Sequence, residues 1–326
     1  MSSYRQLIEI LQQQQDMLVV GHLRPDADCL GTMLALYHAF GGAEKGWVLA
    51  DNDPVPEYLT FLPGMETVQL LNDDMPAPQA LLMVDCSDLD RCGCSQLMAA
   101  WRAAGAEPQI YCIDHHISNQ YEGIGVVEPK ATATAEIVAA LIEYAELPFT
   151  PEVATCLYSG MAADSGCFRH SNTTPRTLRF VANLVEGGLE PEPLNAHLFD
   201  RRSFANMRLV GESFNNMMVC ADGQLCCMTI SEDAMDRFGA TLQDCENIVN
   251  FTLQLIGVKI GMLFVEYQGM VKISMRSRFG CRVDTIATEL GGGGHKQAAA
   301  CRMPGTLDEI MPLALAAAKR ELAKEL

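Results

Sequence analysis

Residues 110–116 read I-Y-C-I-D-H-H, an apolar run of good strand formers that stops on an acid and two histidines. Neighbouring side chains of a strand point to opposite faces, so Asp114, His115 and His116 cannot all serve one face of a regular strand. They fit the end of a strand, where the chain leaves the sheet and can aim each side chain separately. The stretch therefore predicts a strand with a polar site at its carboxyl end.

Two other apolar runs end on similar residues. Residues 17–21 (M-L-V-V-G) lead into H-L-R-P-D-A-D at residues 22–28, and a helical pattern follows from about residue 29 to residue 40. The proline in that segment disfavours helix at the residue before it, which places the polar residues on a strand-to-helix loop. Residues 80–84 (A-L-L-M-V) predict another strand, which ends on Asp85.

A fourth segment, a helix, also ends on an acid. The helix begins after Pro151 and finishes on Asp164, where a carboxylate opposes the helix dipole unless a cation offsets it. Strands and helices alternate along this half of the chain, which predicts an α/β fold with a mostly parallel sheet and helices on both faces. Open sheets of this kind bind ligands beyond the carboxyl ends of their strands.

Each of these residues has a simpler interpretation when it is taken alone. Asp28 would serve as the N-cap of the next helix, His22 as a surface residue, Asp85 as a turn cap and Asp164 as a solvated carboxylate. The weight of the metal-site interpretation comes from the combination. The candidate ligands are His22, Asp26, Asp28, Asp85, His115 and Asp164, with Asp114 and His116 beside them.

Bulk properties limit the class of protein. A chain of 326 residues has room for two domains, and 49% hydrophobic residues allow each a core. No apolar run is long enough to span a bilayer, and no secretory signal pattern is found, so we expect a cytoplasmic protein. The net charge of −18 argues against broad, non-specific attachment to nucleic acid, although it leaves room for a local phosphate site.

The thirteen cysteines favour the same compartment. They form no CxxC pair, which excludes the common zinc patterns, and their odd number does not fit a secreted disulfide framework. Most lie in apolar stretches, where a reduced cysteine acts as a small hydrophobic residue.

The donor types indicate the cation. Aspartates and imidazoles without thiolates suit manganese better than zinc, with magnesium as the alternative. Six ligands exceed the need of one ion, and one carboxylate can bridge two. Two such ions activate water as hydroxide and neutralise phosphoryl oxygens, as in-line displacement at phosphorus requires.

The motifs resemble those of the DHH phosphoesterase superfamily. The match consists of H-x-x-P-D-A-D, V-D-C-S-D, D-H-H and A-A-D-S-G in this order, with small departures at Ala27, Cys29 and Thr32 that replace no ligand. The resemblance implies that one manganese is held by His22, Asp26 and Asp85, and the other by Asp28, Asp85, His115 and Asp164. It implies that His116 faces the phosphoryl group and that Asp114 supports the histidines from behind.

The second half predicts a smaller mixed α/β domain across a cleft from the first. We expect the first domain at residues 1–190, a linker and interdomain helix at 191–214, and the second domain at 215–326. Two hairpins are predicted around Asp222-Gly223 and Gln268-Gly269. A capping box at Thr306 begins the last helix.

A glycine run marks the substrate end of this domain. The segment G-G-G-G-H-K-Q-A-A at residues 291–299 predicts a loop whose backbone approaches an anion, although a flexible surface loop is the plainer interpretation. It resembles the signature of the DHH-associated C-terminal domain. That resemblance implies substrate contacts from Arg276, Gly293, Gly294 and His295.

Chain length and the glycine signature together favour one branch of the superfamily. They suit the bifunctional oligoribonucleases and pAp phosphatases (nanoRNases), so we expect short RNA or nucleotide substrates. No obligate protein partner is evident, and we expect a monomer or a homodimer. A RecJ-type single-strand exonuclease and a non-catalytic nucleotide sensor are the alternatives; the acidic charge argues against the first, and the full ligand set against the second.

Overall fold

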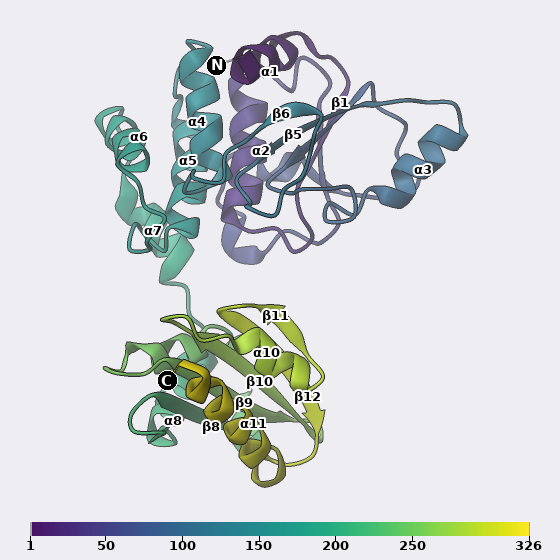
Figure 1. Ribbon diagram of the computed structural model, residues 1–326. Coiled ribbons are helices and arrows are strands. Elements are labelled where there is room, and N and C mark those ends of the chain that lie inside the picture. Colours follow the sequence, from purple (N-terminus) through teal and green to yellow (C-terminus); the bar gives the residue numbers. More distant parts are fainter. Residues whose placement is uncertain (1, 326) are drawn as a thin grey trace. The chain divides into compact units, whose positions relative to one another are not determined.

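The computed structural model describes residues 2–325 and divides into two compact units between Arg201 and Arg202 (Figure 1). Each unit is built on a six-stranded sheet.

The first unit contains a fully parallel sheet in the order β3-β2-β1-β4-β5-β6. Its strands are β1 (Met17–Val20), β2 (Val48–Asp51), β3 (Val68–Leu70), β4 (Ala80–Val84), β5 (Gln109–Asp114) and β6 (Ile124–Val127). Its helices are α1 (Ser2–Gln13), α2 (Ala27–Ala39), α3 (Ser95–Ala103), α4 (Thr134–Tyr144), α5 (Pro151–Asp164), α6 (Pro175–Glu186) and α7 (Pro191–Phe199). The prediction of a parallel α/β sheet is confirmed.

Side chains of the sheet alternate between two cores. In β1, Met17 and Val19 join the core formed with α1, α2, α4 and α5, whereas Leu18 and Val20 face the core that contains α3. Figure 1 shows α3 on the opposite side of the sheet from α2, α4 and α5. Because both faces are covered, the central strands β1 and β4 are apolar and buried throughout, and the polar residues of the motifs are confined to strand ends.

The strand order creates a switch point between β1 and β4. From β1 the chain builds outward through β2 and β3, and then returns to the other side of β1 with β4, β5 and β6. The loops that follow β1 and β4 therefore diverge and leave a crevice at the carboxyl ends of these strands. His22 follows β1 and Asp85 follows β4, so both motifs begin at this crevice.

The second unit has a mixed sheet in the order β11-β12-β10-β9-β8-β7, in which only the β8–β9 pair among the described strands is parallel. Its strands are β7 (Met218–Cys220), β8 (Leu225–Ile230), β9 (Ile260–Tyr267), β10 (Met270–Ser277), β11 (Gly293–His295) and β12 (Ala298–Pro304). Its helices are α8 (Phe204–Asn215), α9 (Glu232–Phe238), α10 (Val283–Glu289) and α11 (Leu307–Leu322). Both expected hairpins form, and Asp222, Gly223, Gln268 and Gly269 all have positive φ.

Three segments differ from the expectation. The linker expected from residue 191 is helical from its first residue, since α7 begins at Pro191, a first helical position where no N–H is needed. The single interdomain helix expected within residues 191–214 is two helices, because α7 ends at Phe199 and Ser203 caps a new helix, α8. The glycine segment expected as a loop contains the short edge strand β11, paired with β12.

Candidate metal centre

The loop after β1 presents His22 and Asp26. Asp26 is the N-cap of α2, since its Oδ1 accepts hydrogen bonds from the backbone N–H groups of Asp28 and Cys29, each at 3.0 Å. The alternative that Asp28 caps this helix is therefore wrong. Nε2 of His22 lies 3.7 Å from Oδ2 of Asp26 and 3.4 Å from Oδ2 of Asp85.

Asp85 lies at the centre of the cluster. It follows β4 directly and has a left-handed backbone with φ of 57°, a conformation that costs about 1–2 kcal/mol for a residue with a Cβ and is common at functional sites. Its Oδ1 lies 3.6 Å from Nε2 of His115 and 3.6 Å from Nδ1 of His116. The side chain of Asp85 is buried between the loop that follows β1, which carries His22, and the loop that follows β5, which carries His115.

The carboxylates of Asp28 and Asp164 approach from the helices. Nε2 of His115 lies 3.1 Å from Oδ2 of Asp164, the last residue of α5. Asp28 is fully buried, and its two oxygens accept the backbone N–H groups of Thr134 (2.7 Å) and Ala135 (2.9 Å) at the start of α4. The hydroxyl of Thr32 also donates to Oδ1 of Asp28, at 3.3 Å. A carboxylate has four lone-pair positions, so these three bonds leave one for a cation.

Asp114 acts on the histidines from behind. Its Oδ1 accepts hydrogen bonds from Nδ1 of His116 at 2.7 Å and from the backbone N–H of His115 at 2.8 Å. Oδ2 of Asp114 accepts Nδ2 of Asn119 at 2.6 Å. The carboxylate thereby assigns the Nδ1 proton of His116 and leaves its Nε2 free for another partner.

The pKa shifts of these clustered residues indicate that the negative charge of the carboxylates is not fully balanced by positive charge. Burial, followed by the charges of Asp85 and Asp164, raises the pKa of Asp28 well above its usual range. Burial also raises the pKa of Asp164, against the lowering effect of His115. Burial alone would lower the pKa of His22, but the neighbouring carboxylates of Asp26 and Asp85 raise it to about 11. Protons are held tightly here because carboxylates crowd together, and cations would relieve the same repulsion.

Three overlapping sets of donors lie close enough to share an ion, with their ligand atoms within 4.8 Å of one another. They are His22, Asp26 and Asp85; Asp85, His115 and His116; and Asp28, His115 and Asp164. Asp85 joins the first set to the second, and His115 joins the second to the third. The donors are carboxylate oxygens and imidazole nitrogens without a thiolate, so the residues fit hard or borderline divalent cations.

Several supporting groups were not predicted from the sequence. Thr134 donates its hydroxyl hydrogen to Oδ1 of Asp85 at 2.7 Å, the carbonyl of Ala131 lies 3.2 Å from Nδ1 of His115, and Asn119 holds Asp114. Asn119 lies only three residues after the D-H-H motif, so its polar side chain could have been identified from the sequence as a local partner of Asp114. Thr134 is 49 residues from Asp85, and no pattern in the sequence relates the two.

The predicted substrate residues lie in the second unit. In the sheet, Arg276 of β10 is paired with Ala298 of β12, which is paired with His295 of β11, so these positions form one row. The side chain of His295 lies outside what the structure describes. Gly294 has φ of 145°, and a Cβ there would lie 2.5 Å from Cα of Ala299, so close packing on β12 requires glycine. A Cβ at Gly293 would meet nothing within 4 Å, so this backbone is accessible.

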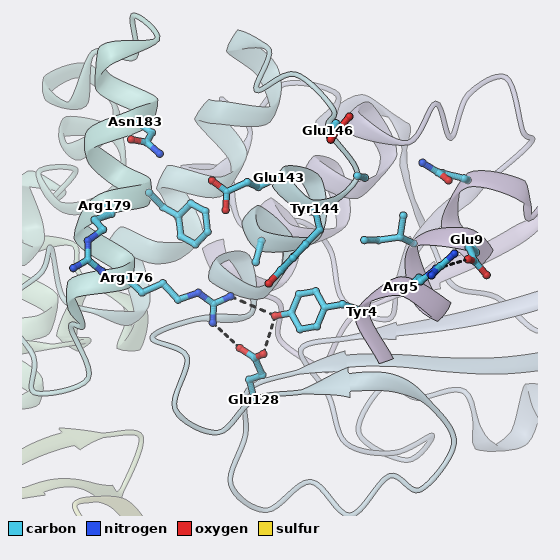
Figure 2. A pocket seen from close by; sticks show the side chains of 15 residues that line it. Tyr4, Arg5, Glu9, Glu128, Glu143, Tyr144, Glu146, Arg176, Arg179 and Asn183 are labelled. Atoms are coloured by element: carbon cyan, nitrogen blue, oxygen red, sulfur yellow. Dashed lines mark hydrogen bonds and ion pairs between the residues drawn. The ribbon is translucent and has the colours of Figure 1, made fainter. Parts of the chain in front are cut away.

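A cavity of about 840 Å³ lies elsewhere in the first unit, between α1, α4 and α6 (Figure 2). Arg176 donates to Oε2 of Glu128 at 2.7 Å on its wall, and the hydroxyl of Tyr4 donates to Oε1 of the same Glu128 at 2.8 Å. None of the candidate metal ligands lines this cavity.

Within residues 2–325, no helix has both the length and the apolar character needed to cross a membrane.

Carboxylates and imidazoles gathered at the switch point of a parallel sheet, with a separate glycine-rich unit, define the class of metal-dependent phosphoesterases. Comparison with known families agrees. The N-terminal domain of the DHH family matches residues 16–161, and the DHHA1 domain matches residues 222–324. The chain belongs to the DHH family, in the branch of the NrnA proteins.

Individual relatives support this assignment. The bifunctional oligoribonuclease and PAP phosphatase NrnA of Thermus thermophilus is 32% identical over 313 residues, which cover 94% of this chain and 90% of the relative. NrnA of Bacillus subtilis is 24% identical, with 89% of this chain and 90% of the relative covered. An exopolyphosphatase-related protein from Bacteroides fragilis shares the fold, with a TM-score of 0.87 and 23% identity over 98% of this chain and 96% of that chain.

Proposed function

We propose that this protein hydrolyses phosphoester bonds in very short RNA, in linear dinucleotides such as pApA or pGpG, and in adenosine 3′,5′-bisphosphate. Two divalent cations would serve the reaction, manganese in preference to magnesium. The observation that carries the proposal is the position of Asp85, whose Oδ2 lies 3.4 Å from Nε2 of His22 and whose Oδ1 lies 3.6 Å from Nε2 of His115. The names of the NrnA relatives support the choice of substrates.

In this proposal the ligands divide between two cations. His22, Asp26 and Asp85 hold one, and Asp28, Asp85, His115 and Asp164 hold the other. When bound, such a pair lowers the pKa of water and neutralises charge on phosphoryl oxygens. Asp85 belongs to both sets, so it would hold a cation together with either group of ligands.

The chain's own residues orient the phosphoryl group. His116 donates from Nδ1 to Asp114, so its Nε2 is the nitrogen that would face a phosphoryl oxygen or the leaving oxygen. Donation from Nε2 requires the doubly protonated imidazolium, whose positive charge the carboxylate of Asp114 stabilises. Its side chain is 32% exposed, which allows a substrate to reach it. Asp114 is fully buried and holds the imidazole of His116 in one orientation. Less conformational entropy is therefore lost when His116 is positioned for the reaction.

We assign the grip on the nucleotide end to the second unit. Arg276 is half-buried, donates to the carbonyl of Met275 at 3.0 Å and makes no ion pair among the described residues. Burial lowers the pKa of Arg276, so an anion beside it would restore the stability of its charge. Gly293 lies on the edge strand β11, and a Cβ there would meet nothing within 4 Å, so the backbone is open to the approach of an anion.

The proposal is tested with a substrate panel. Metal-free protein is assayed on adenosine 3′,5′-bisphosphate, on di- to pentaribonucleotides and on long single strands, each with manganese, with magnesium and with chelator. We expect release of phosphate or mononucleotide from the short substrates, fastest with manganese and absent with chelator. No turnover of any short substrate with manganese would refute the proposal. Processive degradation of the long strands would favour the exonuclease alternative.

A further inference from the structure

Thr134, the first residue of α4, contacts two of the candidate ligands at once. Its hydroxyl donates to Oδ1 of Asp85 over 2.7 Å, and its backbone N–H donates to Oδ2 of Asp28 over 2.7 Å. All three residues are buried. A single residue thus links the ends of two carboxylates that are 57 positions apart in the sequence (85 − 28).

The carboxylate of Asp85 needs such a partner. Its backbone is left-handed, and the imidazoles of His22 and His115 stay 3.4 Å and 3.6 Å from its oxygens, beyond ordinary hydrogen-bond length. The hydroxyl of Thr134 is closer and occupies one lone pair of Oδ1, so the remaining lone pairs stay available for cations. A donor of this kind restricts rotation of the carboxylate about its χ2 torsion, which is otherwise broad.

We propose that Thr134 is a positioning residue that fixes the separation of Asp28 and Asp85, and that it thereby sets the affinity for the cation held by these two residues with His115 and Asp164. The inference rests on the proposed function, because it concerns the same metal centre. The other cation, assigned to His22 and Asp26, shares only Asp85 with it. We therefore expect loss of the hydroxyl to weaken one cation more than the other.

The test compares three variants by titrating Mn²⁺ into metal-free protein without substrate and following free Mn²⁺ by electron paramagnetic resonance. Thr134→Val removes the hydroxyl but keeps the shape and the backbone N–H, and Thr134→Ser keeps the hydroxyl. Thr132→Val is the matched control in the same loop. The hydroxyl of Thr132 donates to the carbonyl of Asn172 at 2.7 Å and bonds Thr177 at 2.6 Å, but it contacts no candidate ligand.

We expect wild-type protein to bind two ions and Thr134→Val to bind one of them about 10–100-fold more weakly, the range for loss of a supporting hydrogen bond. Thr134→Ser should restore wild-type binding. Thr132→Val should lower Tm and leave both Mn²⁺ affinities unchanged. If Thr134→Val does not fold by circular dichroism, Thr134→Ala takes its place with the same expected weakening.

Unchanged affinity for both ions in folded Thr134→Val would overturn the inference. So would equal weakening in Thr132→Val, which would indicate general loosening of the loop, or a wild-type protein that binds fewer than two ions. Failure of the proposed function is seen separately, as absence of hydrolysis by the wild-type protein in the substrate panel.

Discussion

Nδ1 of His116 and Oδ1 of Asp114 lie 2.7 Å apart, in a hydrogen bond that leaves Nε2 of the histidine free. Asp114→Asn places an amide where the carboxylate accepts from both His116 and Asn119, so one of these donors loses its acceptor. We expect kcat to fall by about 10–100-fold with little change in KM. Steady-state kinetics on a dinucleotide measure this, with Asn119→Ala as a milder companion variant. An increase in KM at unchanged kcat would contradict the orienting role.

Asp85→Ala removes a ligand from two donor sets at once. We expect hydrolysis to be abolished, a larger loss than the roughly 10–100-fold that supporting residues cause. Metal content after dialysis against manganese should fall together with activity. Asp88→Ala, an exposed carboxylate on the same loop, is the control and should retain both. Rates like those of the wild type in Asp85→Ala would refute the bridging role.

Arg276→Ala and His295→Ala should weaken substrate binding and leave the metals in place. Loss of one charge-assisted hydrogen bond to phosphate is expected to raise KM for adenosine 3′,5′-bisphosphate by about 10–100-fold. Arg302→Ala, on β12 opposite Lys272 and outside the row of Arg276, should behave like the wild type. The measurement is KM together with bound manganese for each variant. Loss of metal in His295→Ala would show that its assignment to the substrate is wrong.

The carboxyl group of Asp51, at the end of β2, is expected to make the free energy of unfolding depend on pH. The residue is buried, Oδ2 has no hydrogen-bond partner among the described residues, and burial raises its pKa to about 6. The folded protein holds this proton more tightly than the unfolded chain, so its contribution to stability is full below about pH 4 and is lost as the pH rises through about 6.

Replacement of Asp51 by Asn tests this dependence. Asp51→Asn removes the ionisation, and we expect the unfolding free energy of the variant, relative to that of the wild type, to rise by about 1–3 kcal/mol between pH 4 and pH 7. Urea unfolding in the presence of chelator measures the difference. A difference that does not change with pH would contradict the assignment.

Arg176 supports the first unit through ion pairs with two acids, of which Glu136 is buried. Its Nε lies 3.5 Å from Oε1 of the buried Glu136, and its Nη1 donates to Oε2 of Glu128 at 2.7 Å on the cavity wall (Figure 2). Arg176→Ala leaves Glu136 without its cation, and we expect a loss of about 2–4 kcal/mol of stability. Arg179→Ala, exposed on the same helix, should change stability by about 0.5 kcal/mol or less. Equal Tm shifts in the two variants would contradict this role.

Local patterns were enough to predict most strands and the ends on which they stop. Apolar runs such as residues 80–84 are buried on both faces, so their length and composition identify them without knowledge of neighbours. Strand β6 (I-G-V-V) and helix α6 were not predicted. β6 is short and contains Gly125, whose Cβ would lie 2.2 Å from the carbonyl oxygen of Cys112, so this glycine reflects close strand packing that only the sheet reveals.

The amino-acid sequence by itself determined which donor groups the protein has and that each stands at the end of an apolar element, since these depend on residues next to one another in the chain. The tertiary structure alone decided that the loops after β1, β4 and β5 and the end of α5 meet, and that Thr134 links Asp28 with Asp85. Contacts between such distant positions follow from the order of strands in the sheet and from the packing of α4 and α5 beside it, which no local pattern of residues encodes.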